Sequence, residues 1–349
     1  MSLPGSPKGE PVLPTHQNRP RVPRQRLARR SLHAFSAVIG AVLLLGTVAA
    51  CGSSDDSSAS IETITVQHKF GETQVPNDAQ KVVTTGWNDQ EFVLALGVVP
   101  VATRAWFDNY DSFPWVAEAT GGEPLKTLGG DGIDFEAIAK AEPDVIFAIY
   151  ESIDQSTYDR LSQIAPTVIQ SDEYADEETP WDVQLLTTGQ ALGREEEAQA
   201  LVDEVNASVE SAIAANPSFA GKVLVQDYGP QDGGHYLIGQ GDPRQSLFEA
   251  LGFATQETVG DVSEEKLSLL DRDVLFVNGA TKDQMLASPV FAGLNVVQED
   301  RTLYTSFDSN LSGALSYSGP QALLYALDQL VPQLANATTG QPVADLSNA

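Results

Sequence analysis

A stretch without glycine or proline, from Arg194 to Asn216, constrains the fold of this chain more than any other part of its sequence. Apolar residues recur at helical spacing between Leu201 and Ile213, and Pro217 ends the stretch. A helix of this length would span roughly 30 Å, which is about the width of one protein lobe. We therefore predict a single long helix over residues 194–216, which either joins two lobes or lies on the surface of one domain.

The residues on both sides of this helix alternate between short apolar, β-branched runs and amphipathic stretches, as in α/β domains. The apolar runs predict strands at residues 81–86, 98–103, 145–150, 167–170, 222–228, 236–239, 274–278 and 302–307. The amphipathic stretches predict helices at residues 89–96, 135–140, 244–251, 264–270 and 317–330, and residues 61–75 predict an N-terminal hairpin. We expect an α/β protein with an N-terminal lobe at residues 61–193, a C-terminal lobe at 217–335 and a tail at 336–349.

A short repeat relates the two halves. Glu136 lies in the first turn of a predicted helix, and Asp144 opens the apolar run that follows it. Glu265 and Asp273 have the same spacing and the same surroundings in the second half. Each copy predicts a short helix that returns into a buried parallel strand. The repeat therefore favours two lobes of similar build over one domain.

The first fifty residues have the composition of an export signal. A basic segment is followed by uncharged residues 34–50, which are too few for the roughly 20 apolar residues that cross a bilayer. Val48-Ala49-Ala50-Cys51 resembles a bacterial lipobox, and Cys51 is the one cysteine of the chain. Residues 52–60 are small and polar, like a flexible tether. We predict a signal at 1–50, a tether at 51–60, and a protein held to the outer face of the cell membrane only by lipid on Cys51. Arg29-Arg30 leaves Sec and twin-arginine export both open.

Charge and motifs exclude several function classes. The net charge of −28 makes nucleic acid an improbable partner, because phosphate binding needs a basic face. A single cysteine excludes a disulfide framework. His68 and His235 are the only histidines beyond residue 50, so a His-rich metal site is not expected. The sequence has neither a G-x-S-x-G nor an H-E-x-x-H motif. We therefore predict no catalytic residues, no metal site and no cofactor, and a lipid-anchored hydrolase remains the rival from another class.

The order of several motifs resembles the iron-siderophore substrate-binding proteins of ABC importers. The matching segments are residues 81–83, 95–101, 134–138, 142–146, 164–168 and 191–194, and the resemblance extends over residues 61–334. It implies two Rossmann-like lobes joined by one stiff helix, the class III periplasmic binding protein architecture. It also implies a ligand in the cleft between the lobes, with iron held by its chelator and no protein-to-iron bond. By the same resemblance, Glu136 and Glu265 would dock on the permease, although solvated first-turn acids are an alternative. We expect a monomer.

In open α/β sheets, the ligand lies beyond the carboxyl ends of the strands. The residues just past the predicted strands are aromatic or polar, as a cleft for a large organic ligand requires. Arg104 is the strongest candidate, because a guanidinium donates directed hydrogen bonds to carbonyl and hydroxamate oxygens. Arg244 could reach the cleft from the other side. The full predicted set is Trp87, Asn88, Arg104, Trp106, Tyr150, Tyr228, Arg244, Asn278 and Phe307.

The charge of the chain also bears on its ligand. Ferric tris-catecholates are strongly anionic and need several basic residues, whereas only 13 of the 20 Lys and Arg residues lie beyond residue 50, against 47 Asp and Glu. A neutral or cationic ferric hydroxamate is therefore the favoured ligand. Haem held through Tyr150 or Tyr228, or cobalamin, remains open because both bind proteins of the same architecture. Direct capture of manganese or zinc is disfavoured by the scarcity of histidine.

Overall fold

The computed structural model describes residues 62–104, 107–129, 132–230, 234–240 and 242–349. The predicted export signal, Cys51, the whole predicted tether and Trp106 lie outside the described residues. The predicted hairpin is confirmed: β1 (Thr63–His68) pairs antiparallel with β2 (Gly71–Pro76). Within the described part, no helix is both long and apolar enough to cross a bilayer.

The first sheet is entirely parallel, with the strand order β4-β3-β5-β6. Its strands are β3 (Val82–Thr84), β4 (Ala102–Thr103), β5 (Val145–Ala148) and β6 (Thr167–Ile169). Along β5, Val145 and Phe147 pack against α1 (Asp89–Ala95), α5 (Trp181–Leu192) and the hairpin. The alternate residues Ile146 and Ala148 pack against α3 (Phe135–Ala141) and α4 (Gln155–Ser162) on the other face. Both faces are therefore covered, which explains the uninterrupted apolar run of β5.

A segment between β4 and α3 holds the 3-10 helix η1 (Tyr110–Ser112) and α2 (Pro114–Thr120). Neither element is among the helices predicted from the sequence. Their buried side chains form an aromatic cluster with Tyr317, which belongs to the second half of the chain. This segment is thus part of the contact between the two halves.

The second sheet is mixed, with the order β10-β8-β7-β11-β12 and β9 beside β7. β8 runs antiparallel to β7 and β10, whereas β9, β11 and β12 are parallel to their partners. The strands are β7 (Val223–Asp227), β8 (Gly234–Ile238), β9 (Ala254–Thr255), β10 (Gly260–Ser263), β11 (Val274–Gly279) and β12 (Thr302–Ser306).

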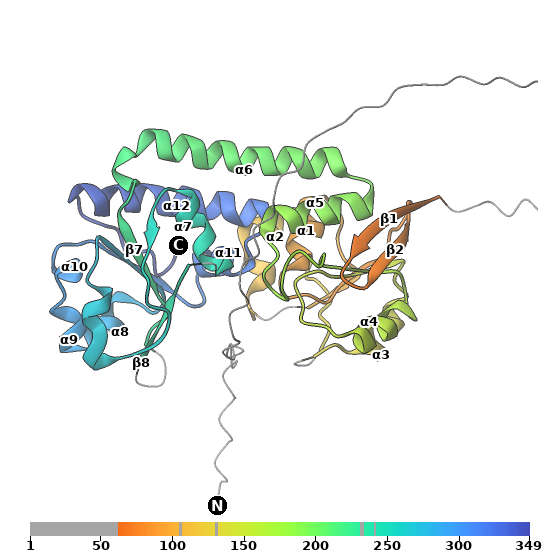
Figure 1. Cartoon of the computed structure of the whole chain (residues 1–349), viewed down its shortest axis with the longest axis horizontal. Coiled ribbons are helices and arrows are strands. Elements are labelled where there is room, and N and C mark those ends of the chain that lie inside the picture. The colour runs from red at the N-terminus through yellow and green to blue at the C-terminus, as the bar shows by residue number, and fades with distance from the viewer. Residues whose placement is uncertain (1–61, 105–106, 130–131, 231–233, 241) are drawn as a thin grey trace, which may run out of the picture. The chain divides into compact units, whose positions relative to one another are not determined.

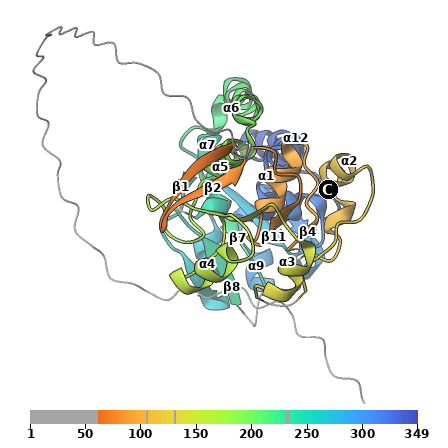
Figure 2. The ribbon, with the colours of Figure 1, turned by 90° about the vertical axis from the view of Figure 1, so that its right-hand side faces the viewer.

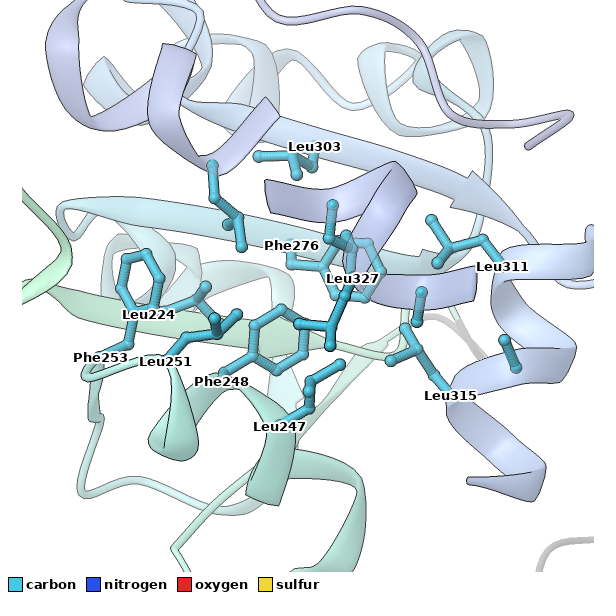
Figure 3. Close-up of a cluster of buried hydrophobic side chains, with 14 of the residues drawn as sticks. Leu224, Leu247, Phe248, Leu251, Phe253, Phe276, Leu303, Leu311, Leu315 and Leu327 are labelled. Atoms are coloured by element: carbon cyan, nitrogen blue, oxygen red, sulfur yellow. The ribbon is translucent and has the colours of Figure 1, made fainter. Parts of the chain in front are cut away.

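Helices cover both faces of this sheet. Figure 3 shows the core of one face, where Leu224, Phe276 and Leu303 pack against side chains of the covering helices. These helices are α7 (Ser246–Ala250), α11 (Asn310–Tyr317) and α12 (Pro320–Thr339), with the short 3-10 helices η2 (Pro217–Phe219) and η3 (Pro243–Gln245) beside them. The other face and its surroundings carry the 3-10 helix η4 (Glu264–Leu270), α8 (Lys282–Leu286), α9 (Pro289–Ala292) and α10 (Asn295–Gln298).

The long helix predicted from residues 194–216 is confirmed as α6 (Glu195–Ala215). It lies along α5 and α12, as Figures 1 and 2 show. Ala198 and Val202 in its first half pack with α1 and α5, whereas Val205 joins the core of the second sheet. The helix therefore connects the two α/β halves, and the predicted fold class is confirmed.

The structure corrects several predicted elements. The predicted helix at 317–330 begins later, as α12 at Pro320, because Tyr317 ends α11 and Ser318 adopts a left-handed conformation with φ 55°. Residues 264–270 form a 3-10 helix, and the predicted strand at 98–103 is reduced to β4. The predicted boundary at residue 335 falls inside α12, which runs to Thr339. Leu346, in the predicted tail, is buried in the core of the second sheet.

Candidate functional site

The carboxyl ends of β3, β4 and β5 bring together a stacked arginine and its acid. Trp87 follows β3, Arg104 follows β4 and Glu151 follows β5. The guanidinium carbon of Arg104 lies 3.3 Å from the centroid of the Trp87 ring. Nη1 of Arg104 donates to a carboxylate oxygen of Glu151 and, at 3.5 Å, to the carbonyl of Thr85. The side chains of Arg104 and Glu151 are only 11% and 12% exposed, so water screens the pair little.

Burial raises the pKa of Glu151 to about 7, although the Arg104 guanidinium opposes this shift. Asp89 and Glu177 add to the rise because their negative charges disfavour a further carboxylate. Sequence reasoning missed Glu151, because its role depends on a contact with Arg104, which lies 47 residues earlier in the chain.

Asp89 holds the loops of this site in place. Its carboxylate lies at the start of α1 and accepts hydrogen bonds from the backbone N–H groups of Gly86, Ile149 and Tyr150 at 3.0–3.1 Å. Trp87 also donates its backbone N–H to the carbonyl of Tyr150 at 3.0 Å. Burial raises the pKa of Asp89 to about 6, against these backbone donors, which lower it. The loops after β3 and β5 are therefore fixed to each other, and the positions of Trp87 and Tyr150 with them.

The second half offers a similar arrangement around Arg244. Its Nε and Nη2 donate to the two carboxylate oxygens of Asp242 at 2.9 and 2.7 Å, a bidentate pair. Its guanidinium carbon lies 5.5 Å from the ring centroid of Tyr228, which follows β7. The Arg244 and Asp242 side chains are 25% and 21% exposed. An aromatic ring, an arginine and a carboxylate are thus grouped in each half.

Electrostatics places the two groups near each other. Burial raises the pKa of Tyr150, and the charges of Asp242 and Glu177 raise it further, whereas Arg244 lowers it. Tyr150 belongs to the first half and Arg244 to the second. The loops after the strands of the two halves are therefore close enough for a charge in one to shift the pKa of a group in the other.

The remaining predicted residues occupy different settings. Phe307 stacks on Phe107, with ring centroids 5.0 Å apart and an angle of 9° between the rings. Asn278 is buried at 2% exposure. Asn88 is also buried and donates to the backbone carbonyl of Tyr317 at 3.0 Å, so its side chain joins the two halves. The side chains of Asn88 and Asn278 therefore have little contact with solvent in this conformation.

Gly279 lies between two of the predicted aromatic residues. Its φ of +98° is in the left-handed region, and a Cβ at this position would lie 3.8 Å from the rings of both Tyr228 and Phe307. Both rings therefore approach the backbone where β11 ends, and the positive φ of Gly279, rather than a lack of space, favours glycine there.

A buried acid lies at the contact between the halves. Glu91 on α1 accepts hydrogen bonds from the Tyr110 hydroxyl at 2.8 Å and from the Trp115 indole N–H at 3.0 Å. Burial raises the pKa of Glu91 to about 7, against both donors. A cavity of about 210 Å³ beside it reaches Gln321 on α12. This acid was not predicted, since its neighbours come from distant segments.

The two acids predicted to dock on a permease are both exposed. Glu136 lies in the first turn of α3, whose N-cap Asp134 accepts from the backbone N–H of Glu136 and Ala137. Glu265 lies in the first turn of η4. Both therefore occupy the same position in the repeat, in the first turn of a short helix that precedes a central strand.

Histidine has a structural setting in both halves. His235 is buried and pairs through Nδ1 with Asp227 at 2.7 Å, whereas His68 contacts Thr73 and Tyr158. Among the described residues, no group of three or more His, Cys, Asp or Glu side chains could hold a metal ion. The site can thus offer stacked rings and directed N–H donors to an organic ligand.

Comparison with known proteins gives consistent results. The sequence profile of the periplasmic binding protein family matches residues 82–308. The iron(3+)-hydroxamate-binding protein YxeB of Bacillus subtilis is 25% identical over 301 residues, covering 77% of this chain and 88% of that protein.

Two solved structures have the same fold. A periplasmic solute binding protein from Mycobacterium smegmatis is 31% identical, with a TM-score of 0.74 over 79% of this chain and 99% of that one. PiaA of Streptococcus pneumoniae in complex with ferrichrome is 23% identical, with a TM-score of 0.66 over 80% of this chain and 99% of that one.

Proposed function

The chain belongs to the periplasmic binding protein family, and on this basis we propose that it captures a ferric siderophore and delivers it to the permease of an ABC importer. The family binds solutes, and the relative YxeB binds an iron(3+)-hydroxamate by its name. The structure of PiaA with ferrichrome is that of a hydroxamate complex on the same fold. A ferric hydroxamate is therefore the preferred ligand class.

One observation carries this proposal: an arginine lies over an aromatic ring beyond the strand ends of each sheet, at stacking distance in the first and at cation–π distance in the second. Arg104 lies over Trp87, and Arg244 lies over Tyr228. Guanidinium N–H groups suit the carbonyl and hydroxamate oxygens around the iron, and the rings suit the organic shell. The iron would stay within its chelator, without a bond to the protein.

The proposed site lies between the lobes. We assign residues 61–193 to the N-terminal lobe, 194–216 to the connecting helix and 217–349 to the C-terminal lobe, because α12 runs to Thr339 and Leu346 is buried in the core of the second sheet. In this assignment, Tyr150 belongs to one lobe and Arg244 to the other. The charge of Arg244 lowers the pKa of Tyr150, which supports a site between the lobes. The chain would act as a monomer.

The protein would work outside the cytoplasmic membrane. The lipobox-like residues before Cys51 support lipidation of this cysteine after export, and residues 52–60 would form the tether. Exposed Glu136 and Glu265 would contact basic pockets of the permease, one from each lobe.

Ligand binding can be tested by thermal unfolding and tryptophan fluorescence with four probes: ferrichrome, a ferric tris-catecholate, haem and cobalamin. At one hundred times its dissociation constant, a ligand stabilises the native state by about 2.7 kcal/mol. We expect ferrichrome to raise the melting temperature and to quench fluorescence at the lowest concentration. Stronger binding of the tris-catecholate would contradict the hydroxamate preference. A Soret band after mixing with haem, without a response to ferrichrome, would instead show a haem carrier. Hydrolysis of ester or glycoside reporters would favour the hydrolase alternative.

A further inference from the structure

Each arginine of the proposed site already has a carboxylate beside it. Arg104 pairs with Glu151, and Arg244 pairs with Asp242 through two hydrogen bonds. The two acids do not correspond in sequence, because Glu151 follows β5, a different strand from the one that Arg104 follows, whereas Asp242 is two residues from its arginine. Each half thus pairs an arginine with a carboxylate, but the carboxylate comes from a different place in the sequence relative to its arginine.

Pairing removes the net charge of the arginines but leaves them as hydrogen-bond donors. A guanidinium has five N–H groups, more than one carboxylate can accept. An uncharged ligand oxygen can therefore still be bound. A strongly anionic ligand gains little, since the negative charge of the carboxylate lies as close as the positive charge of the arginine.

The residues around Arg104 and Glu151 further disfavour an anionic ligand. Asp89 and Glu177 both lie close enough to raise the pKa of Glu151, so further negative charge surrounds the pair. Because the Arg104 and Glu151 side chains are about nine-tenths covered, salt and water screen these charges only in part.

We infer that Glu151 and Asp242 are specificity-determining residues: each cancels the charge of its arginine, and together they select neutral ferric complexes over anionic ones. The inference rests on the proposed function, since it concerns the ligand of that same site.

The test measures the affinity of two complexes for the full-length protein by equilibrium dialysis with radiolabelled iron at pH 8, above the pKa of about 7 of Glu151, so that this acid is ionised. The probes are uncharged ferrichrome and the ferric complex of a hexadentate tris-catecholate. We expect Glu151→Gln and Asp242→Asn each to bind the tris-catecholate about tenfold more tightly than the wild type, because each variant removes the carboxylate that is paired with its arginine. The affinity for ferrichrome should change by less than about threefold, and added salt should reduce the gain for the tris-catecholate.

Three control variants separate the local charge from other effects. Glu151→Asp and Asp242→Glu keep the negative charge and should retain the wild-type preference. Glu196→Gln removes an exposed acid from α6, which changes the net charge equally without touching the site, and should also behave as the wild type. Melting temperatures of all variants identify any that fail to fold. If only one of Glu151→Gln and Asp242→Asn folds, that variant is enough for the test.

The outcomes distinguish this inference from the function on which it rests. If folded Glu151→Gln and Asp242→Asn change both affinities by the same factor, the acids only position their arginines and the inference is wrong, although the proposed function stands. The same conclusion follows if the affinity for the tris-catecholate does not rise. If the wild type binds neither complex, the proposed function fails and the inference fails with it.

Discussion

At the residue scale, Arg104 has the setting that a ligand-binding arginine requires. Its planar group is fixed by the Trp87 ring on one side and by Glu151 at one end. A lysine at this position would carry the same charge but could neither stack in the same way nor donate in a plane. The geometry of the guanidinium therefore matters more than its charge.

We expect Arg104→Ala to weaken ferrichrome binding by about 10- to 100-fold, as loss of a charge-assisted hydrogen bond and of a stacked contact would do. Arg104→Lys should recover only a small part of this loss. The matched control is Arg160→Ala, because Arg160 also stacks on an aromatic ring, Phe135 at 3.6 Å, but outside the proposed site. Fluorescence titration measures all three variants, and an equal loss in Arg160→Ala would argue against a specific role of Arg104.

The buried acid Glu91 leads to a prediction about how the stability of the protein depends on pH. Burial raises its pKa from the model-peptide range near 4.5 to about 7 in the folded protein, so the native state binds the proton more tightly than the unfolded chain does. Between about pH 4.5 and 7, the stability that this group contributes is lost as the pH rises.

We expect Glu91→Gln to remove the free-energy cost of burying an ionised carboxylate, since a neutral amide oxygen can still accept from Tyr110 and Trp115. The variant should be more stable than the wild type by about 1–3 kcal/mol at pH 8, and the difference should shrink towards pH 5. Urea unfolding at several pH values measures it. A difference that stays constant over this range would show that Glu91 does not titrate there.

At the scale of elements, the contact between the halves depends on a glycine in a helix. Gly313 lies within α11, and a Cβ there would come within 2.2 Å of the buried Phe113 ring. Alanine favours a helix over glycine by up to about 1 kcal/mol. The clash should outweigh this gain, because the ring is fully buried and packed among other aromatic rings.

We expect Gly313→Ala to destabilise the protein by about 1–3 kcal/mol. Replacing Phe113 with leucine in the same chain should recover part of the loss, because the smaller side chain leaves room for the methyl group. Gly129→Ala serves as control, since a Cβ at that position meets open space. Thermal unfolding of the single and double variants gives the coupling between the two sites. Additive effects would show that Phe113 and Gly313 do not constrain each other.

Elements were more predictable from the sequence than contacts between them. The spacing of apolar residues in α6 and the run of apolar residues in β5 indicate which residues are buried. Both elements can therefore be predicted from the local sequence alone. The break at Ser318 carries no such pattern, because a left-handed serine is rarely distinguishable from a helical one in sequence. Glu151 beside Arg104 and Glu91 beside Trp115 join segments far apart in the chain, so only the folded structure brings them together.

At the scale of the whole molecule, the repeat of Glu136 and Glu265 suggests a function that needs both lobes. Each acid is exposed, and each lies in the first turn of a short helix before a central strand of its sheet. An exposed acid contributes little to folding, so its loss should leave the protein stable. Interaction with basic pockets of a permease would depend on both, since one contact in each lobe fixes the orientation of the protein on its partner.

We therefore expect the double variant Glu136→Ala, Glu265→Ala to bind ferrichrome as the wild type does but to lose most siderophore-dependent iron uptake in cells. Each single variant should retain intermediate uptake, because the other lobe still docks. Glu118→Ala, which removes another exposed acid from α2, is the matched control and should leave uptake unchanged. Ligand affinity is measured on the purified variants and uptake with radiolabelled ferrichrome. Full uptake by the double variant would show that the two acids are ordinary solvated residues, whereas weakened ligand binding would show that they act on the cleft rather than on the permease.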